Sequence, residues 1–165
     1  MELLIHALPI GVGATLLMDL WGAVRQPLFG FARLDYALLG RWVGGMASGR
    51  FSHDTIATSA PVRGERLIGW AAHYLIGVSF AAVLLAIWGA AWMHRPTLGP
   101  ALLVGIGTTA APLLIMQPAM GAGIAASRTP RPNAARMRSL ITHTIDGLGS
   151  TSWAEKKTDY ALLAS

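Results

Sequence analysis

The sequence predicts an all-α membrane protein, a helical bundle of three transmembrane helices and a short fourth helix whose insertion is in doubt. Mean hydropathy is +0.49, and hydrophobic residues make up 53% of the 165 residues. Only 13% of the residues are charged, about half the share that is usual in soluble domains. The apolar residues also occur in long blocks, each able to cross roughly 30 Å of hydrocarbon at 1.5 Å per residue.

The first predicted span covers residues 3–24. It is preceded by Glu2 and lacks the basic segment that begins a signal peptide, and no small-residue cleavage site follows it. We therefore expect a retained span and not a signal peptide. The second span covers residues 67–92, with Trp70 near its start and Trp88 and Trp92 near its end. These indoles are about 27–33 Å apart at helical rise, as expected for the two membrane interfaces.

The third predicted span covers residues 98–126, and we expect Pro118 and the GAG after it to unwind its end. The fourth helix is predicted at 137–153, MRSLITHTIDGLGSTSW. Its apolar run is short, because Asp146 interrupts it and Lys156 and Lys157 end it early. We therefore expect one helical domain, residues 1–153, followed by a polar tail at 154–165.

The stretch LDYALLGRWVGGM, between the first two spans, has an apolar residue at every fourth position: Leu34, Leu38, Trp42 and Met46. This pattern leaves two interpretations open. The stretch is either an amphipathic helix on the membrane interface or a helix packed against the end of the bundle. The following stretch, FSHDTIATSAPVRGE, is rich in turn residues and is expected to be irregular.

Arginine counts predict the direction of threading. Six arginines lie between the first two spans, one lies between the second and third, and four follow the third span. Because Lys and Arg accumulate in cytoplasmic segments, the first and last of these segments are expected in the cytoplasm and the N-terminus outside.

Each predicted helix carries a polar residue on a stripe of small residues spaced by four, which keeps the stripe close to one helix face. The stripes are Gly11-Thr15-Asp19-Ala23, Gly69-His73-Gly77-Ala81, Gly105-Thr109-Leu113-Gln117-Gly121-Ala125 and Ser139-His143-Gly147-Thr151. Small residues let helices approach closely in lipid. With the inferred threading, Asp19, His73, Gln117 and His143 all fall in the inner-leaflet half, and we predict that they form one polar intramembrane layer.

Three roles for this layer stay open. Hydrogen bonds among its members could fix the helices, or its titratable residues could carry protons or a solute. Asp19, His73 and His143 also supply ligand types that suit zinc or iron, but no metal-binding spacing is present, and we predict no metal site. The chain has no cysteine and no P-loop, dinucleotide or nucleophile motif. We therefore expect no cofactor, assign no catalytic residue and expect a non-enzymatic protein.

Four stretches, GVGATLLMDLW, LDYALLGRW, GWAAHYLIGVSFA and APLLIMQPAMGAGIAASRTPRP, resemble a family of small bacterial inner-membrane proteins known as domain of unknown function 2938. The resemblance covers about residues 1–149. It implies a four-helix, multi-pass protein of the inner membrane and no known activity. The sequence departs from the family after His143, where a fully apolar helix is expected and IDGLGSTSWAEKK is found.

These observations predict a small integral inner-membrane protein that acts as a non-enzymatic accessory or self-associating subunit. A proton-coupled carrier of a small solute is the first alternative, and a membrane-embedded metalloenzyme is the second. The expected partners are the lipid bilayer and either a second copy or another membrane protein. Nucleic acid is not expected, because the arginines cluster between the apolar blocks in the manner of a topology signal.

Overall fold

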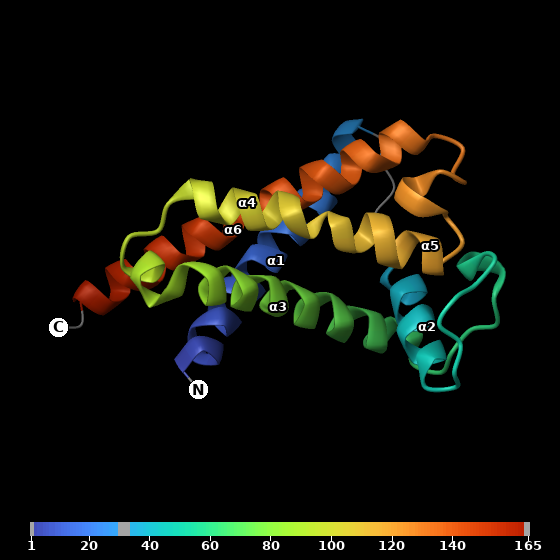
Figure 1. Cartoon of the computed structure of the whole chain (residues 1–165), viewed down its shortest axis with the longest axis horizontal. Helices are drawn as coiled ribbons and strands as arrows, with labels where there is room; N and C mark the ends of the chain where they lie inside the picture. Colours follow the sequence, from blue (N-terminus) through green and yellow to red (C-terminus); the bar gives the residue numbers. More distant parts are fainter. Residues whose placement is uncertain (1, 30–33, 164–165) are drawn as a thin grey trace. The chain divides into compact units, whose positions relative to one another are not determined.

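The computed structural model describes residues 2–29 and 34–163, apart from the side chains of residues 2, 29, 90 and 157–163. These ranges are predominantly helical and contain no strand (Figure 1). Three helical stretches are long and apolar enough to cross a membrane: Leu3–Leu28, Glu65–Gly89 and Leu98–Ala119. The predicted all-α fold class is therefore confirmed. In chain order the elements are α1 (Glu2–Phe29), α2 (Tyr36–Met46), η1 (Ile56–Thr58), α3 (Glu65–His94), α4 (Leu98–Thr108), the π-helical η2 (Pro112–Met116), α5 (Gln117–Ala119), η3 (Ile124–Ala126) and α6 (Pro132–Leu163).

The third apolar helix runs from α4 through η2 into α5 and ends at Ala119, earlier than the predicted residue 126. Gly121 and Gly123 follow with φ values of 89° and 75°, in the left-handed region that favours glycine. The unwinding expected from the GAG stretch is therefore present, and it shortens the helix.

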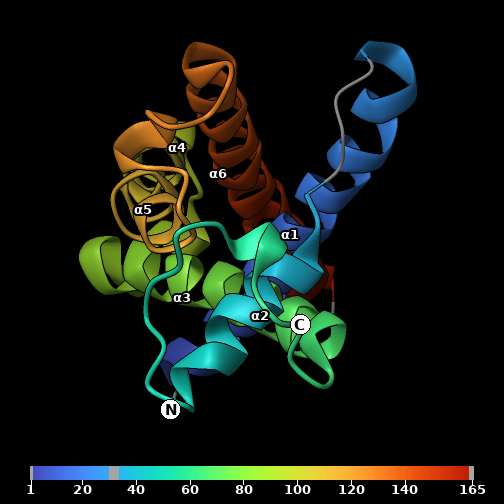
Figure 2. The same ribbon diagram turned by 90° about the vertical axis from the view of Figure 1, so that its right-hand side faces the viewer.

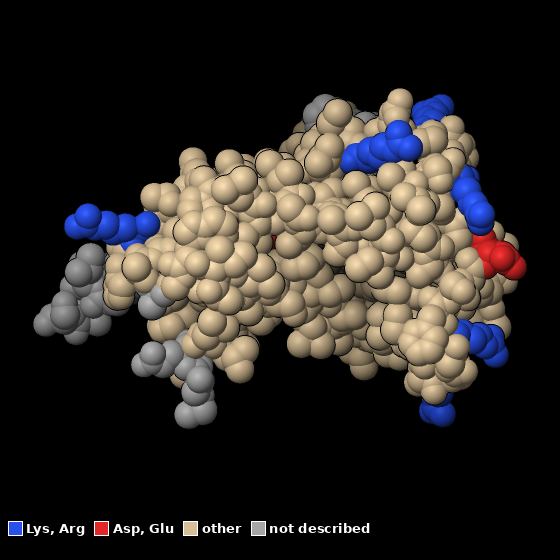
Figure 3. All heavy atoms as spheres, viewed as in Figure 1, with Lys and Arg blue, Asp and Glu red and all other residues tan. Residues whose placement is uncertain are grey.

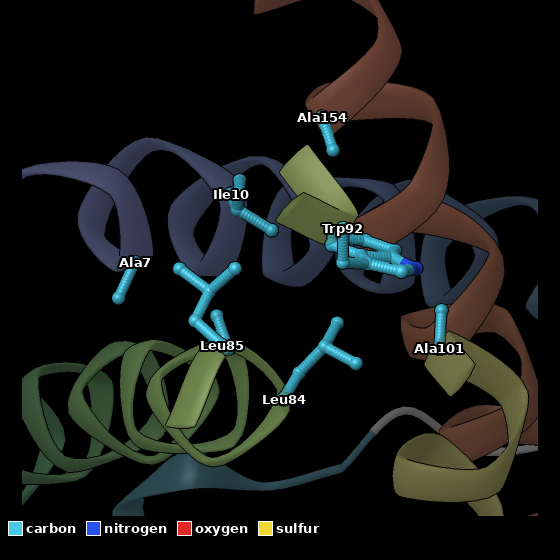
Figure 4. Close-up of a cluster of buried hydrophobic side chains, with 8 residues drawn as sticks. Ala7, Ile10, Leu84, Leu85, Trp92, Ala101 and Ala154 are labelled. Atoms are coloured by element: carbon cyan, nitrogen blue, oxygen red, sulfur yellow. The ribbon is translucent and has the colours of Figure 1, made fainter. Parts of the chain in front are cut away.

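Contacts divide the chain into two compact units. Unit 1 comprises Met1–Ala32, Tyr74–Thr108 and Thr142–Ser165, and unit 2 comprises Arg33–His73 and Thr109–Ile141. The hydrophobic core of unit 1 is a cluster of buried side chains from α1, α3, α4 and α6 (Figure 4): Ala7, Ile10, Ala81, Leu84, Leu85, Trp92, Ala101 and Ala154. The small side chains among them let the helices approach closely.

In unit 2, α2 packs against the first turns of α3. Its N-terminus is capped by Asp35, whose Oδ1 accepts a hydrogen bond from Ala37 N at 3.0 Å. A Cβ on Gly40 would meet the backbone of α3, and a Cβ on Gly69 would meet the backbone of α2. This stretch is therefore a helix packed on α3, and its position at the membrane interface stays a prediction. Figure 2 shows α2 and the long loop that follows it.

Helix α6 is longer than the predicted 137–153 and continues through the predicted polar tail to Leu163. In unit 1 it packs against two apolar helices through glycines: a Cβ on Gly105 of α4 would meet His143 O and Gly147, and a Cβ on Gly149 would meet Ala14 of α1. α6 is not among the three helices that qualify as spans by composition.

In a soluble amphipathic helix the apolar face is buried, whereas the middle part of α6 buries polar side chains. Asp146, Ser150 and Thr151 are buried, with 6%, 6% and 3% of their surface exposed. Leu148 is exposed, whereas the ring of Trp153 lies against Gly13 of α1 and is 38% exposed. The polar side chains of this part of α6 therefore face unit 1, and Leu148 faces outward.

Candidate functional site

Asp19 is held by a hydrogen bond between two apolar helices of unit 1. The hydroxyl of Tyr74 on α3 donates to Asp19 Oδ2 on α1 at 3.1 Å. One turn earlier, α1 and α3 approach so closely that a Cβ on Gly77 would meet the hydroxyl of Thr15. That hydroxyl donates to Gly11 O at 2.7 Å, so its own hydrogen-bonding need is met. The Asp19 carboxylate thus acts as an acceptor across a close helix–helix contact.

His143 makes the corresponding contact between α6 and α4 in unit 1. Its Nδ1 lies 3.1 Å from Thr108 Oγ1, and the same hydroxyl donates to Gly105 O at 2.8 Å. The hydroxyl of Thr108 thus lies within hydrogen-bond distance of both the His143 ring and a carbonyl of its own helix. The ring of Phe80 lies 5.8 Å from the imidazole, between centroids.

His73 belongs to an aromatic cluster in unit 2. Its side chain is 7% exposed, and its ring stacks on Tyr36 of α2 with centroids 4.2 Å apart and an interplanar angle of 26°. Trp70, one turn earlier on α3, meets the imidazole edge-on with centroids 6.0 Å apart. The stacking contact with Tyr36 joins α2 to α3, beside the glycine contact described above.

Gln117 differs from the other three predicted residues. Its Oε1 is buried and has no hydrogen-bond partner in the described part of the chain. The same is true of Thr109 Oγ1, two turns earlier on the third apolar helix. These atoms lie on either side of the π-helical η2, in which Gln117 N donates to Pro112 O, five residues back.

The four residues predicted as one layer fall into two pairs. Asp19 and His143 lie in unit 1, and His73 and Gln117 lie in unit 2. The layer as a whole therefore stays a prediction. Among the residues that the structure describes, no three His, Asp or Glu side chains are grouped as a metal ion would require.

Arg41 forms an extensive polar contact in unit 2, and the sequence pattern did not reveal it. Its Nε and Nη2 donate to Oε2 and Oε1 of Glu65 at 2.8 and 2.9 Å. Its Nη1 donates to the carbonyls of Ile56, Ala57 and Ser59 in the loop after α2. The hydrogen bonds to Glu65 raise the pKa of the Arg41 guanidinium above its usual value.

The loop after α2 is also fixed to the end of the third apolar helix. His53 N donates to Ala119 O at 2.8 Å, and Ile56 N donates to Met120 O at 3.1 Å. Positions 34–64 had suggested only a short helix and an irregular stretch. The sequence analysis did not predict the ion pair between Arg41 and Glu65, because these residues are 24 positions apart.

These features define an all-α chain with three helices apolar enough to cross a membrane and with polar contacts built between them. The family model described as protein of unknown function (DUF2938) matches residues 8–155, and the chain belongs to this family. The resemblance seen in the sequence is therefore confirmed. Comparisons with curated proteins and with solved structures found no match.

Proposed function

We propose that the protein is a non-enzymatic, multi-pass protein of the bacterial inner membrane that acts as an accessory subunit. The observation that carries this proposal is the hydrogen bond from Tyr74 to Asp19, which joins α1 to α3. A carboxylate within an apolar helix is costly unless it is paired. His143 with Thr108, and His73 with Tyr36, likewise join helices of their own units. A structural role for these residues needs no substrate and no catalytic group.

The outward surfaces of the apolar helices support a lipid environment. Large aliphatic side chains are exposed along α1, among them Leu4, Leu8 and Leu20 at 62%, 59% and 61%. Charged atoms are sparse over α4 in Figure 3. Apolar surface of this extent is unusual in a soluble monomer. The bilayer is therefore the first partner, and a second copy or another membrane protein would dock on these aliphatic faces.

The packing of α6 supports a fourth span. Asp146, Ser150 and Thr151 face the helices of unit 1, while Leu148 faces outward. The low mean hydropathy of the middle of α6 then reflects in part a polar buried face, which does not require a polar surface there. With four spans, both ends of the chain lie on the outer side of the membrane.

The test compares two substitutions of Asp19. Asp19→Asn keeps an oxygen that accepts from Tyr74, so we expect a normally folded protein that restores the phenotype of a deletion strain. Asp19→Leu removes the acceptor and should lower the stability in detergent by about 1–2 kcal/mol, the upper range for hydrogen bonds in membranes. An Asn variant that folds normally but fails to restore the phenotype would contradict the structural role.

A proton-coupled carrier of a small solute is the second candidate, and a different observation favours it. The third apolar helix contains the π-helical turn η2 and unwinds after Ala119, and π-helical turns within α-helices are frequent at functional sites. Thr109 Oγ1 and Gln117 Oε1, on either side of this turn, are buried without partners in the described part of the chain. Loss of phenotype in the folded Asp19→Asn variant is the result that this candidate predicts.

A further inference from the structure

The third apolar helix carries buried oxygen atoms that accept no hydrogen bond from the described residues. Thr109 is 2% exposed, and its Oγ1 has no partner in this part of the chain. A buried threonine in a helix ordinarily bonds the carbonyl four residues earlier, as Thr15 does with Gly11. Gln117 Oε1, eight residues further on, is likewise buried and unpartnered. Burial of such atoms is unfavourable unless something supplies the missing hydrogen-bond partners.

The backbone between these two residues adds further acceptors. Pro112 and Pro118 have no N–H, so the carbonyls of Thr108 and Leu114 lose their usual donors. Because Gln117 N donates to Pro112 O, five residues back, Leu113 O also loses the donor that an α-helix would give it. Two prolines and one π-helical turn thus remove the usual α-helical donors of three carbonyls within a short stretch.

Thr109, Leu113 and Gln117 are spaced by four and therefore lie close to one face of the helix. This face offers a hydroxyl oxygen, a backbone carbonyl and an amide oxygen. Leu114 and Ile115 lie off this face and are exposed, at 58% and 62%. The Leu113 carbonyl and Gln117 Oε1 accept hydrogen bonds, and the Thr109 hydroxyl can accept one while it donates another, so the face suits a small species that donates hydrogen bonds.

We propose that Thr109, the carbonyl of Leu113 and Gln117 line a hydrated site that binds a small solute through its hydrogen-bond donors. Water and a primary ammonium ion share this chemistry, because both donate several hydrogen bonds from one small centre. The site deepens the carrier candidate and rests on it. The structural role of Asp19 is tested separately and does not depend on it.

The chain contains no cysteine, which makes a thiol-accessibility experiment direct. Single substitutions Leu113→Cys, Leu114→Cys and Ile115→Cys are made and labelled in inner-membrane vesicles with methyl methanethiosulfonate or with its aminoethyl analogue, which carries a primary ammonium. The thiolate attacks the reagent sulfur, forms a mixed disulfide and releases methanesulfinate. Only variants whose thermal unfolding in detergent matches that of the parent chain are compared.

We expect the Leu113→Cys chain to react at least about tenfold faster than the Leu114→Cys and Ile115→Cys chains, because the thiolate is the reactive form and lipid suppresses its formation. Rates for each reagent are divided by its rate with a free thiol in solution. A higher normalised rate for the aminoethyl reagent, with protection by methylammonium chloride, identifies ammonium as the solute class. Equal normalised rates without protection identify water. The proposal is overturned if the Leu113→Cys chain is labelled as slowly as the Leu114→Cys and Ile115→Cys chains. It is also overturned if all three chains are labelled equally fast.

A second comparison ties the labelling to the proposed groups. Thr109→Val, added to the Leu113→Cys chain, removes the hydroxyl at nearly constant shape and should slow labelling several-fold. Thr15→Val is the matched control, because that hydroxyl is also fully buried but already bonded to Gly11 O. An equal effect of the two substitutions would show that general loosening, and not the site, controls access, and it would overturn the proposal.

Discussion

At the residue scale, the contact between α1 and α3 depends on glycines whose missing side chains let two backbones meet. A Cβ on Gly11 would lie 2.5 Å from Val78 Cα, and a Cβ on Gly77 would meet Thr15 Oγ1. Neither neighbour is the flexible end of a long side chain, so the helices themselves would have to move. The hydrogen bond between Tyr74 and Asp19 lies beside this contact and depends on the same close approach.

Gly77→Ala should therefore destabilise the protein. We expect a loss of about 1–3 kcal/mol, the usual effect of adding a methyl group to a tightly packed site. Gly22→Ala is the matched control on α1, because nothing lies within 4 Å of its added Cβ. It should leave stability unchanged or raise it by up to about 1 kcal/mol through better helix propensity. Unfolding in mixed detergent micelles measures both, and equal effects would contradict the close contact.

How much of the site the sequence predicts also differs by residue. Spacing by four placed Thr15, Gly77 and Gly105 on stripes, and all three are buried. The partners were not predicted, since Tyr74 and Thr108 lie outside the stripes. The Arg41–Glu65 pair was missed for a related reason. Periodicity reports which face of a helix is apolar, but it does not report which residue on another helix lies opposite.

At the scale of elements, composition predicts well which segments are helical, but it predicts poorly where each helix ends. The three apolar helices follow from block length and hydropathy. The end of the third depends on two glycines with positive φ, and the length of α6 was underestimated. In α6 the apolar run predicted to break at Asp146 continues as a packed helix. Asp146 is buried with Ser150 and Thr151 on the face that packs on α1 and α4, where small and polar side chains fit between helices, whereas Lys156 is exposed.

Two serines of α6 test this orientation. Ser150 is 6% exposed on the packed face, whereas Ser152 is exposed and its hydroxyl only bonds Leu148 O. Ser150→Leu should lower the stability in detergent by about 1–3 kcal/mol through overpacking. Ser152→Leu should be neutral there and should strengthen insertion, because leucine favours a membrane centre by about 0.3–0.6 kcal/mol. The reverse order of effects would mean that α6 presents its polar face outward.

At the scale of the whole molecule, the distribution of charge along the chain predicts how it is threaded. Exposed arginines occur between α2 and α3 (Arg50 and Arg63), in the first turn of α3 (Arg66) and between η3 and α6 (Arg128 and Arg131). Only Arg95 lies between α3 and α4. Because positive residues near the ends of spans are retained in the cytoplasm, α3 and the third apolar helix should form a hairpin whose short connection lies outside.

Reporter fusions test this threading and the span count together. A reporter that is active only in the cytoplasm should be active when fused after Arg50 or Arg131 and silent at Arg95. Fused after Ser165, it should be silent if α6 crosses the membrane and active if α6 stays on the inner side. Because α6 buries its polar face against two apolar helices, we expect the fusion at Ser165 to be silent. A reporter that is active only outside should give the opposite pattern at every site.

Activity at Arg95 with silence at Arg50 would reverse the threading. Activity at Ser165 with the other three sites as expected would leave the three apolar helices in place and refute only the fourth span.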